Sequence, residues 1–143
     1  MRVRAPIDAV WPTVLDPSMY PRLIPSLDRT RVVERDGDNS VLFMHHSYAI
    51  AETEYYMRVS VEEAEHTVRF RLDRSRAHGS IREGRGFIAL RSYRGGTIVS
   101  WGMLADVGAG MVMRVFGPFL NEWLLLPPRC IRDEIEPGRE NVC

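Results

Sequence analysis

The four histidines are the residues best suited to metal or acid–base chemistry. His45 and His46 are adjacent, so on a strand they point to opposite faces, whereas a metal site on a strand would need the pattern His-x-His. His66 and His78 fall in predicted turns, without a carboxylate at ligand spacing. We therefore expect no metal site. One of the adjacent pair must face the interior, where a neutral imidazole could hydrogen-bond a ligand or transfer a proton, and the sequence leaves open which one.

Other catalytic motifs are missing from the sequence. It contains no Gly-x-Ser-x-Gly, no dinucleotide fingerprint, no P-loop and no His-Glu-x-x-His. All nineteen basic residues are arginine, which excludes lysine Schiff-base chemistry, a lysine general base and a Walker-type lysine. Glutamates gather between positions 52 and 65, but strand alternation sends Glu54 and Glu62 outward and the others into turns. We interpret them as solvated, name no catalytic residue and expect no cofactor.

Composition limits the classes of binding partner that we expect. The 143 residues suffice for one domain, and nineteen acidic residues balance the basic ones, so no bulk attraction to nucleic acid or to an anionic membrane is expected. The first six residues lack an apolar signal segment, and the apolar tract 103–126 is interrupted by Asp106, Arg114 and Glu122. We therefore expect no transmembrane segment and a cytoplasmic location, with a longer precursor left open. The oligomeric state is left open too.

The two cysteines fit neither a disulfide framework nor a metal motif. Cys130 lies in an apolar, helical stretch, and Cys143 is the last residue of the sequence. We interpret Cys130 as a small buried hydrophobe.

The prolines separate a sheet from its flanking helices. None occurs between Pro25 and Pro118, so the sheet is expected within 26–117. Turn signals divide this region into about six strands with short connections, which favours an antiparallel meander. The first strands are expected at Thr30–Glu34 and Ser40–Tyr48, with turns at 35–39, 49–52, 63–66, 77–79 and 93–96.

Helical patterns flank the sheet on both sides. A short helix is expected to begin at Pro6, and a second helical or turn-rich piece covers 16–25. After the sheet, apolar residues at three-and-four spacing from Val112 to Leu124 predict an amphipathic helix. The pair Pro127-Pro128 is expected to kink or split this helix.

Alternation along the strands predicts one bulky face. Residues opposed across an antiparallel hairpin share a face, so each short turn fixes which positions lie together. Two hairpins give the same result, because their apolar and aromatic positions fall on one side. These positions are Tyr55, Met57, Val59, Val61, Val68, Phe70, Leu72, Ile88, Leu90, Val99, Trp101 and Met103. The last helix is expected to cover this face.

The same alternation extends back from Ile88 to Gly86, Gly84 and Arg82. Two glycines at inward positions would leave a gap or bend the strand around a helix. Arg82 would then point inward as a cationic anchor for an acidic or carbonyl-bearing ligand, unless a bulge shifts the alternation and leaves it in solvent.

Two motifs stand near the N-terminus: residues 5–11 read Ala-Pro-Ile-Asp-Ala-Val-Trp, and residues 16–21 read Asp-Pro-Ser-Met-Tyr-Pro. They are similar to the A-P-x-x-x-V-W opening and the D-x-x-x-Y-P second helix of the START/Bet v 1-like (SRPBCC) superfamily. Pro25 before a strand, the Gly86 strand and the run 95–99 also fit. The resemblance covers nearly the whole chain and is nearest to the bacterial polyketide cyclase/dehydrase and lipid-transport branch. Departures are a shorter first strand and the proline pair in the last helix.

This resemblance implies an α+β helix-grip fold: two short N-terminal helices, then a curved antiparallel β-sheet wrapped around a long C-terminal helix. It also implies a hydrophobic cavity between sheet and helix. We expect one domain over 1–136 with a tail at 137–143.

The expected function is binding or transport of a small hydrophobic molecule, lipid-like or aromatic, without catalysis. The ligand-binding residues would be Tyr55, Met57, Phe70, Leu72, Arg82, Ile88, Leu90, Trp101, Met103, Phe116, Leu120 and Trp123. One alternative is a cyclase/aromatase using the same cavity, in which His45 or His46, Tyr55 and Arg82 would move protons or polarise carbonyls. Another is an interaction module with a tightly packed sheet and no cavity.

Overall fold

A computed structural model describes residues 1–48, 51–79, 81–107, 120–136, 138 and 143. Along the chain the elements are β1 (Arg2–Val3), α1 (Ile7–Leu15), the 3-10 helix η1 (Pro17–Met19), α2 (Tyr20–Leu23), β2 (Leu27–Asp36), β3 (Asn39–Tyr48), β4 (Ala51–Glu62), the 3-10 helix η2 (Glu63–Glu65), β5 (Thr67–Leu72), β6 (Glu83–Tyr93), β7 (Gly96–Asp106) and α4 (Leu120–Ile135).

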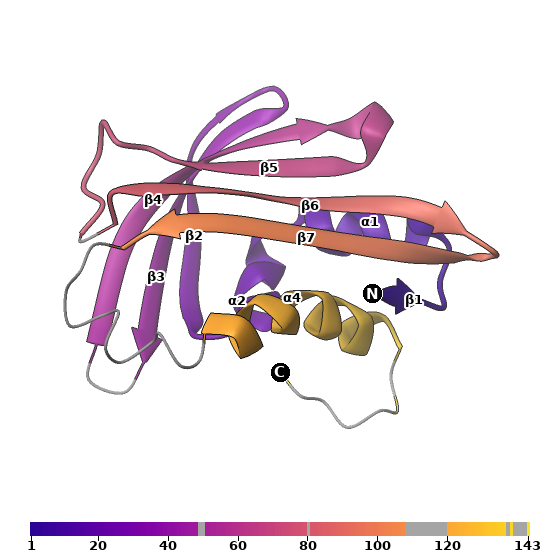
Figure 1. The fold of residues 1–143 in the computed structure, drawn as a ribbon. Helices are drawn as coiled ribbons and strands as arrows, with labels where there is room; N and C mark the ends of the chain where they lie inside the picture. The colour runs from indigo at the N-terminus through magenta and orange to yellow at the C-terminus, as the bar shows by residue number, and fades with distance from the viewer. Residues whose placement is uncertain (49–50, 80, 108–119, 137, 139–142) are drawn as a thin grey trace.

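The described strands form one seven-stranded antiparallel sheet in the order β1-β7-β6-β5-β4-β3-β2. From β2 to β7 each strand pairs with the next along the chain, which confirms the predicted meander. The sheet bends strongly, so that β2 to β4 turn away from the direction of β5 to β7 (Figure 1). The N-terminal β1 adds to the free edge of β7.

Two tight turns fix the register that the alternation anticipated. Tyr93 pairs with Gly96, so Arg94 and Gly95 form the connection, and both have the positive φ that a two-residue hairpin turn requires. At the other turn, His66 caps the C-terminal end of η2, and its φ is 47°. Val61 then pairs with Val68 and Ile88 with Trp101, which confirms the predicted shared face.

The N-terminal helices begin close to where the prolines predicted. Pro6 is the N-cap of α1 rather than its first residue, because its extended ψ of 156° lies outside the helix. η1 and α2 occupy the expected second helical piece. The Trp11 indole donates a hydrogen bond of 2.9 Å to Glu63 Oε1, which ties α1 to the turn between β4 and β5.

The C-terminal helix differs from its prediction, because α4 continues through Pro127 and Pro128 to Ile135 instead of splitting there. Each proline removes only its own amide donor, while Cys130 and Ile131 are almost fully buried and hold the following turn against the other helices. The first part of the expected stripe, 112–119, lies outside the described residues. No helix in the described ranges is long and apolar enough to cross a membrane.

The interpretation of Cys130 as an unpaired hydrophobe is wrong. It is buried, as expected, but its sulfur forms a disulfide with Cys143, and the two Cα atoms lie 5.6 Å apart. The bond ties Cys143, thirteen positions further along the sequence, to α4.

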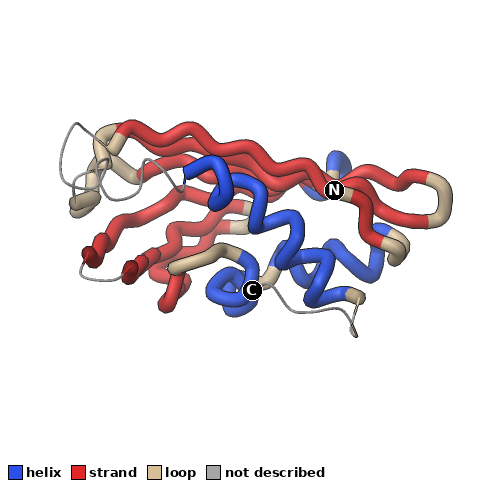
Figure 2. The backbone as a smooth tube through the Cα atoms, turned by 60° about the horizontal axis from the view of Figure 1, so that its bottom comes forward, coloured by secondary structure: helices blue, strands red, loops and turns tan. Residues whose placement is uncertain are grey.

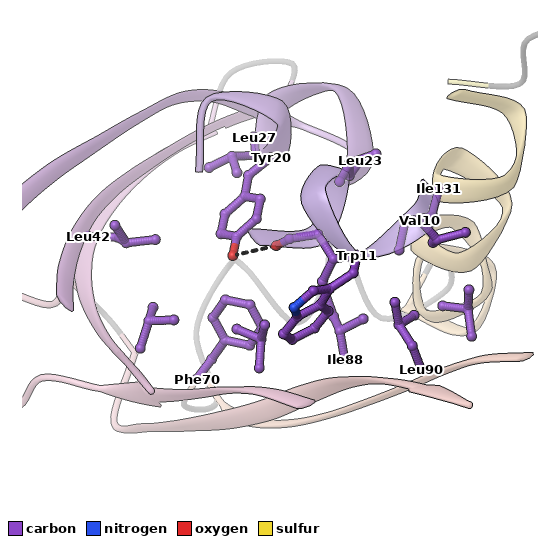
Figure 3. Close-up of a cluster of buried hydrophobic side chains, with 14 of the residues drawn as sticks. Val10, Trp11, Tyr20, Leu23, Leu27, Leu42, Phe70, Ile88, Leu90 and Ile131 are labelled. Atoms are coloured by element: carbon purple, nitrogen blue, oxygen red, sulfur yellow. Dashed lines mark hydrogen bonds between the residues drawn. The ribbon is translucent and has the colours of Figure 1, made fainter. Parts of the chain in front are cut away.

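The helices lie together on one side of the curved sheet, its inner face (Figure 2). α4 packs against α1, α2, β1 and β7. Figure 3 shows the core between the layers, where Tyr20 from α2 reaches toward Phe70 on the sheet. Their rings are 5.8 Å apart, and the Tyr20 hydroxyl donates to the Val14 carbonyl. This is the α+β helix-grip arrangement that the resemblance implied.

Candidate functional site

The register places the expected sheet residues on the inner face. Met57 opposes Leu72, Phe70 opposes Gly86, and Gly86 in turn opposes Met103. Burial separates this face into two parts. The well-buried residues Phe70, Leu72, Ile88 and Leu90 belong to or adjoin the packed core. The less buried residues are Tyr55, Met57, Trp101 and Met103.

The incompletely covered residues mark the candidate site. Met103 has 46% of its surface exposed although it lies on the inner face. Tyr55, Met57 and Trp101 pack against the core from its margin and stay partly accessible. The inner-face site is defined here by these four residues. Phe70 contacts it through the Trp101 ring, with the ring centroids 6.5 Å apart.

Two glycines of β6 lie on the inner face beside this site. A Cβ atom on Gly86 would come within 2.7 Å of the Gly102 carbonyl oxygen, so this position requires glycine. Gly84 is buried on the same face and would meet only Leu72 and Ile81 at ordinary contact distances. At Gly86 the backbone of β7 therefore occupies the place of a side chain, whereas Gly84 leaves room for a methyl group.

Trp101 carries an unsatisfied polar group. Its indole Nε1 is buried and has no hydrogen-bond partner among the described residues. A buried donor left unpaired costs about 1–3 kcal/mol, so such groups are uncommon in packed proteins. Trp101 lies two positions before the exposed Met103 on β7, so the unpaired donor lies beside the exposed part of the inner-face site.

A polar network occupies the β3–β4 end of the same face. His46 Nδ1 lies 3.0 Å from Ser26 Oγ, and His46 Nε2 lies 2.7 Å from Tyr55 Oη. The imidazole and phenol rings stack, with centroids 5.5 Å apart and an interplanar angle of 12°. In a neutral imidazole one nitrogen donates and the other accepts, so each hydroxyl takes the complementary role.

Burial sets the protonation of this network. Desolvation lowers the pKa of His46 to about 4, against a weaker opposing effect from Asp28. Burial also raises the pKa of Tyr55 above its ordinary value. Both groups are therefore neutral at pH 7, and they can offer hydrogen bonds but hold protons poorly matched to acid–base exchange at that pH.

His45, the other member of the histidine pair, belongs to the outer face. Its Nδ1 lies 2.6 Å from Asp28 Oδ1, and its Nε2 lies 3.8 Å from Glu52 and 3.9 Å from Glu54. In the described part of the chain, no histidine, cysteine and carboxylate side chains are grouped as a metal site. The inward histidine that the sequence left open is therefore His46.

Arg82 lies apart from these groups. It immediately precedes β6, its side chain is exposed, and its backbone N–H donates to the Asp106 carbonyl at 2.7 Å. No ion pair of Arg82 is found among the described residues. The structure therefore places it at the surface, as in the solvated alternative.

The helix residues expected in the site are only partly placed. Leu120 and Trp123 lie in α4 at positions where the structure describes only the backbone, and Phe116 lies outside the described residues. Sequence reasoning missed Ser26 entirely. Its φ of 62° turns the chain from α2 into β2, and the sequence Pro25-Ser26 signalled a turn without showing that the hydroxyl would reach His46.

A family model described as polyketide cyclase/dehydrase and lipid transport matches residues 1–125. No curated protein matches the chain in sequence. Among solved structures, a STAR-related lipid transfer protein from Xanthomonas axonopodis superposes with a TM-score of 0.77 at 14% identity, over 94% of this chain and 82% of that chain.

Two further solved structures share the fold. The Zhui aromatase/cyclase from Streptomyces gives a TM-score of 0.74 at 13% identity, over 94% of this chain and 89% of that chain. A START superfamily protein from Mycobacterium smegmatis gives 0.72 at 14% identity, over 94% and 92%. At these identities the likeness establishes the fold alone, and the family model confirms the resemblance first carried by the N-terminal motifs.

Proposed function

The chain belongs to the polyketide cyclase/dehydrase and lipid transport family, and we propose that it binds or transports a small hydrophobic molecule at the inner-face site. The family description and the similar lipid transfer protein support this class of ligand. An apolar ligand would cover Met57 and Met103, and it would contact the faces of Tyr55 and Trp101.

The buried Trp101 N–H carries the proposal. The donor is already buried, so a ligand oxygen that accepts this hydrogen bond would recover a lost interaction without displacing a partner among the described residues. The ligand should therefore combine an apolar body with at least one acceptor oxygen.

The state of His46 favours binding over catalysis. A histidine with a pKa of about 4 is almost entirely deprotonated at pH 7, and its weak basicity makes it a poor general base there. Exposed Arg82 adds no buried cation to polarise a carbonyl. The Ser26–His46–Tyr55 network is better suited to orient a polar part of the ligand.

A matched pair of ligands tests the Trp101 contact. Anthracene and anthraquinone have similar planar bodies, but only the quinone carries acceptor oxygens. We expect Trp101→Phe to weaken anthraquinone binding about tenfold, the loss of roughly one hydrogen bond, and to leave anthracene binding nearly unchanged. Isothermal titration calorimetry of delipidated protein measures both.

The control is Tyr93→Phe, which removes a hydroxyl from an exposed residue next to the Arg94-Gly95 turn. It should leave both affinities unchanged. If neither ligand class, nor a fatty acid, binds the delipidated protein saturably, the proposed function is wrong. Equal losses for both ligands in Trp101→Phe would instead remove the indole donor from the site.

A second candidate is a cyclase/aromatase, and the hydrogen-bonded His46–Tyr55 pair is the observation that favours it. The similar Zhui aromatase/cyclase supports the same possibility. Mass spectrometry of the ligand recovered after incubation separates the two functions. A binding protein returns a polyketone mimic unchanged, whereas a cyclase returns a dehydrated product.

A further inference from the structure

The outer face of the sheet, opposite the helices, carries a row of arginines in direct register. Arg58 on β4 opposes Arg71 on β5, and Arg71 opposes Arg85 on β6. Like charges placed directly opposite each other destabilise a sheet. Three neighbouring strands thus each carry a positive charge at directly opposed positions.

Among the described residues, the nearby carboxylates pair with only one arginine of this row. Glu62 binds Arg69 at 2.6 Å, and Glu83 approaches Arg74 at 3.9 Å. Arg58 reaches the buried carboxylate of Asp73 at 3.3 Å.

This leaves the other two arginines of the row. Arg71 and Arg85 are exposed, and neither forms an ion pair within the described ranges. A planar guanidinium is well suited to bind carboxylates through two parallel hydrogen bonds.

The arginine row crosses a hollow. Its volume is 1240 Å³, and its lining includes all three arginines. At one end lie Glu34 and Asp36 of β2.

Apolar side chains line the other end of this hollow. They are Phe87 of β6 and Leu104 of β7, which is 51% exposed. At a spacing of about 4.8 Å per strand, the hollow spans roughly 24 Å from β2 to β7.

We propose that this hollow is a docking surface for an acidic, amphipathic helical segment of a partner protein. The carboxylates of the segment pair with Arg71 and Arg85, and its apolar end covers Leu104 and Phe87. A helix of about 16 residues matches the span of the hollow. Arg71 and Arg85 point to the side of the sheet opposite the inner-face site, although Met103, one of the four residues that define that site, also lines the hollow.

The shape and charge of the hollow favour a protein segment over other anions. A single phosphate group would occupy a small part of a hollow that spans six strands. An anionic bilayer would press against Glu34 and Asp36 at one end, which costs electrostatic energy. A helix can place acidic residues only where the arginines lie.

The test uses a synthetic amphipathic peptide with glutamates along one face and leucines at one end, and a second peptide with glutamine in place of every glutamate. Fluorescence anisotropy measures binding to the full chain. We expect the acidic peptide to bind and the glutamine peptide not to bind. The double variant Arg71→Gln/Arg85→Gln should lose about tenfold or more in affinity, because both charge-assisted contacts are removed.

Arg91→Gln is the matched control, because Arg91 is an exposed arginine six positions along the same strand and on the same face. It should bind the acidic peptide like the wild type. Thermal unfolding distinguishes a loss of peptide binding from a loss of fold stability. Removing opposed like charges should raise the Tm of the double variant by about 1–3 °C while its peptide affinity falls.

Any of three results would overturn the proposal. The first is that the wild type does not bind the acidic peptide, and the second is that Arg91→Gln weakens binding as much as the double variant does. The third is that phosphatidylserine vesicles or pyrophosphate bind through Arg71 and Arg85 while the peptide does not. None of these results bears on ligand binding at the inner-face site.

Discussion

At the scale of single residues, His46 makes the stability of the fold depend on pH. Its pKa in the folded chain is about 4, below the ordinary 6.5 that applies when the chain unfolds. As the pH falls below 6.5, the unfolded chain takes up this proton first, so folding loses stability until about pH 4. We expect this one group to cost about 3 kcal/mol across that window.

Urea unfolding at pH 7 and pH 4.5 measures this loss, and His46→Gln should remove most of it. Tyr55→Phe is the control, because it keeps a buried His46 and should keep the pH dependence while losing one hydrogen bond. The carboxyl of Asp73, whose pKa Ser75 and Arg58 lower to about 2, contributes only at lower pH. A pH dependence that survives in His46→Gln would contradict the assignment.

The inward histidine could have been predicted from the sequence. A turn of two residues after Tyr48 and a turn of four both pair even positions of β3 with odd positions of β4. Either length puts His46 on the face of Tyr55. The contact of Ser26 with His46 could not be predicted, because the position of Ser26 depends on a left-handed backbone conformation between two elements.

At the scale of elements, the close pairing of β6 with β7 depends on Gly86. A Cβ atom there would lie 2.7 Å from a backbone oxygen of β7, which cannot move without breaking the strand pairing. Gly86→Ala should therefore lower the free energy of unfolding by about 1–3 kcal/mol. Chemical denaturation checks this value.

Gly84→Ala provides a matched substitution on the same strand and face. Its Cβ would meet Leu72 at 3.5 Å, an ordinary contact, so the variant should be neutral or up to about 1 kcal/mol more stable. Equal destabilisation of both variants would show that β6 resists any side chain here, rather than a specific clash at Gly86.

Local patterns predicted the elements unequally. Alternation and turn residues gave the meander and its inner face, because both are set by short-range geometry. The path of α4 through Pro127 and Pro128 depends instead on the burial of Cys130 and Ile131 by distant elements. The disulfide to Cys143 likewise depends on where the chain returns, which spacing alone does not determine.

At the scale of the whole molecule, the two faces of one sheet separate two kinds of contact. The inner face holds the core and the partly covered apolar residues, whereas the outer face carries Arg58, Arg71 and Arg85. A net charge of zero therefore conceals a local concentration of positive charge. The sequence composition argued against bulk electrostatic attraction, and only the cross-strand register brings these arginines together.

Ligand binding at the inner-face site should stabilise the entire chain, because the ligand binds the folded state and not the unfolded one. At about 100 times its Kd, anthraquinone should add about 2.7 kcal/mol and raise the Tm by roughly 5–10 °C. The shift should grow with the logarithm of ligand concentration and shrink in Trp101→Phe. Arg71→Gln/Arg85→Gln should show the full shift, since its changes lie on the outer face. A Tm that does not respond to saturating ligand would contradict the proposed function while leaving the docking surface to its own test.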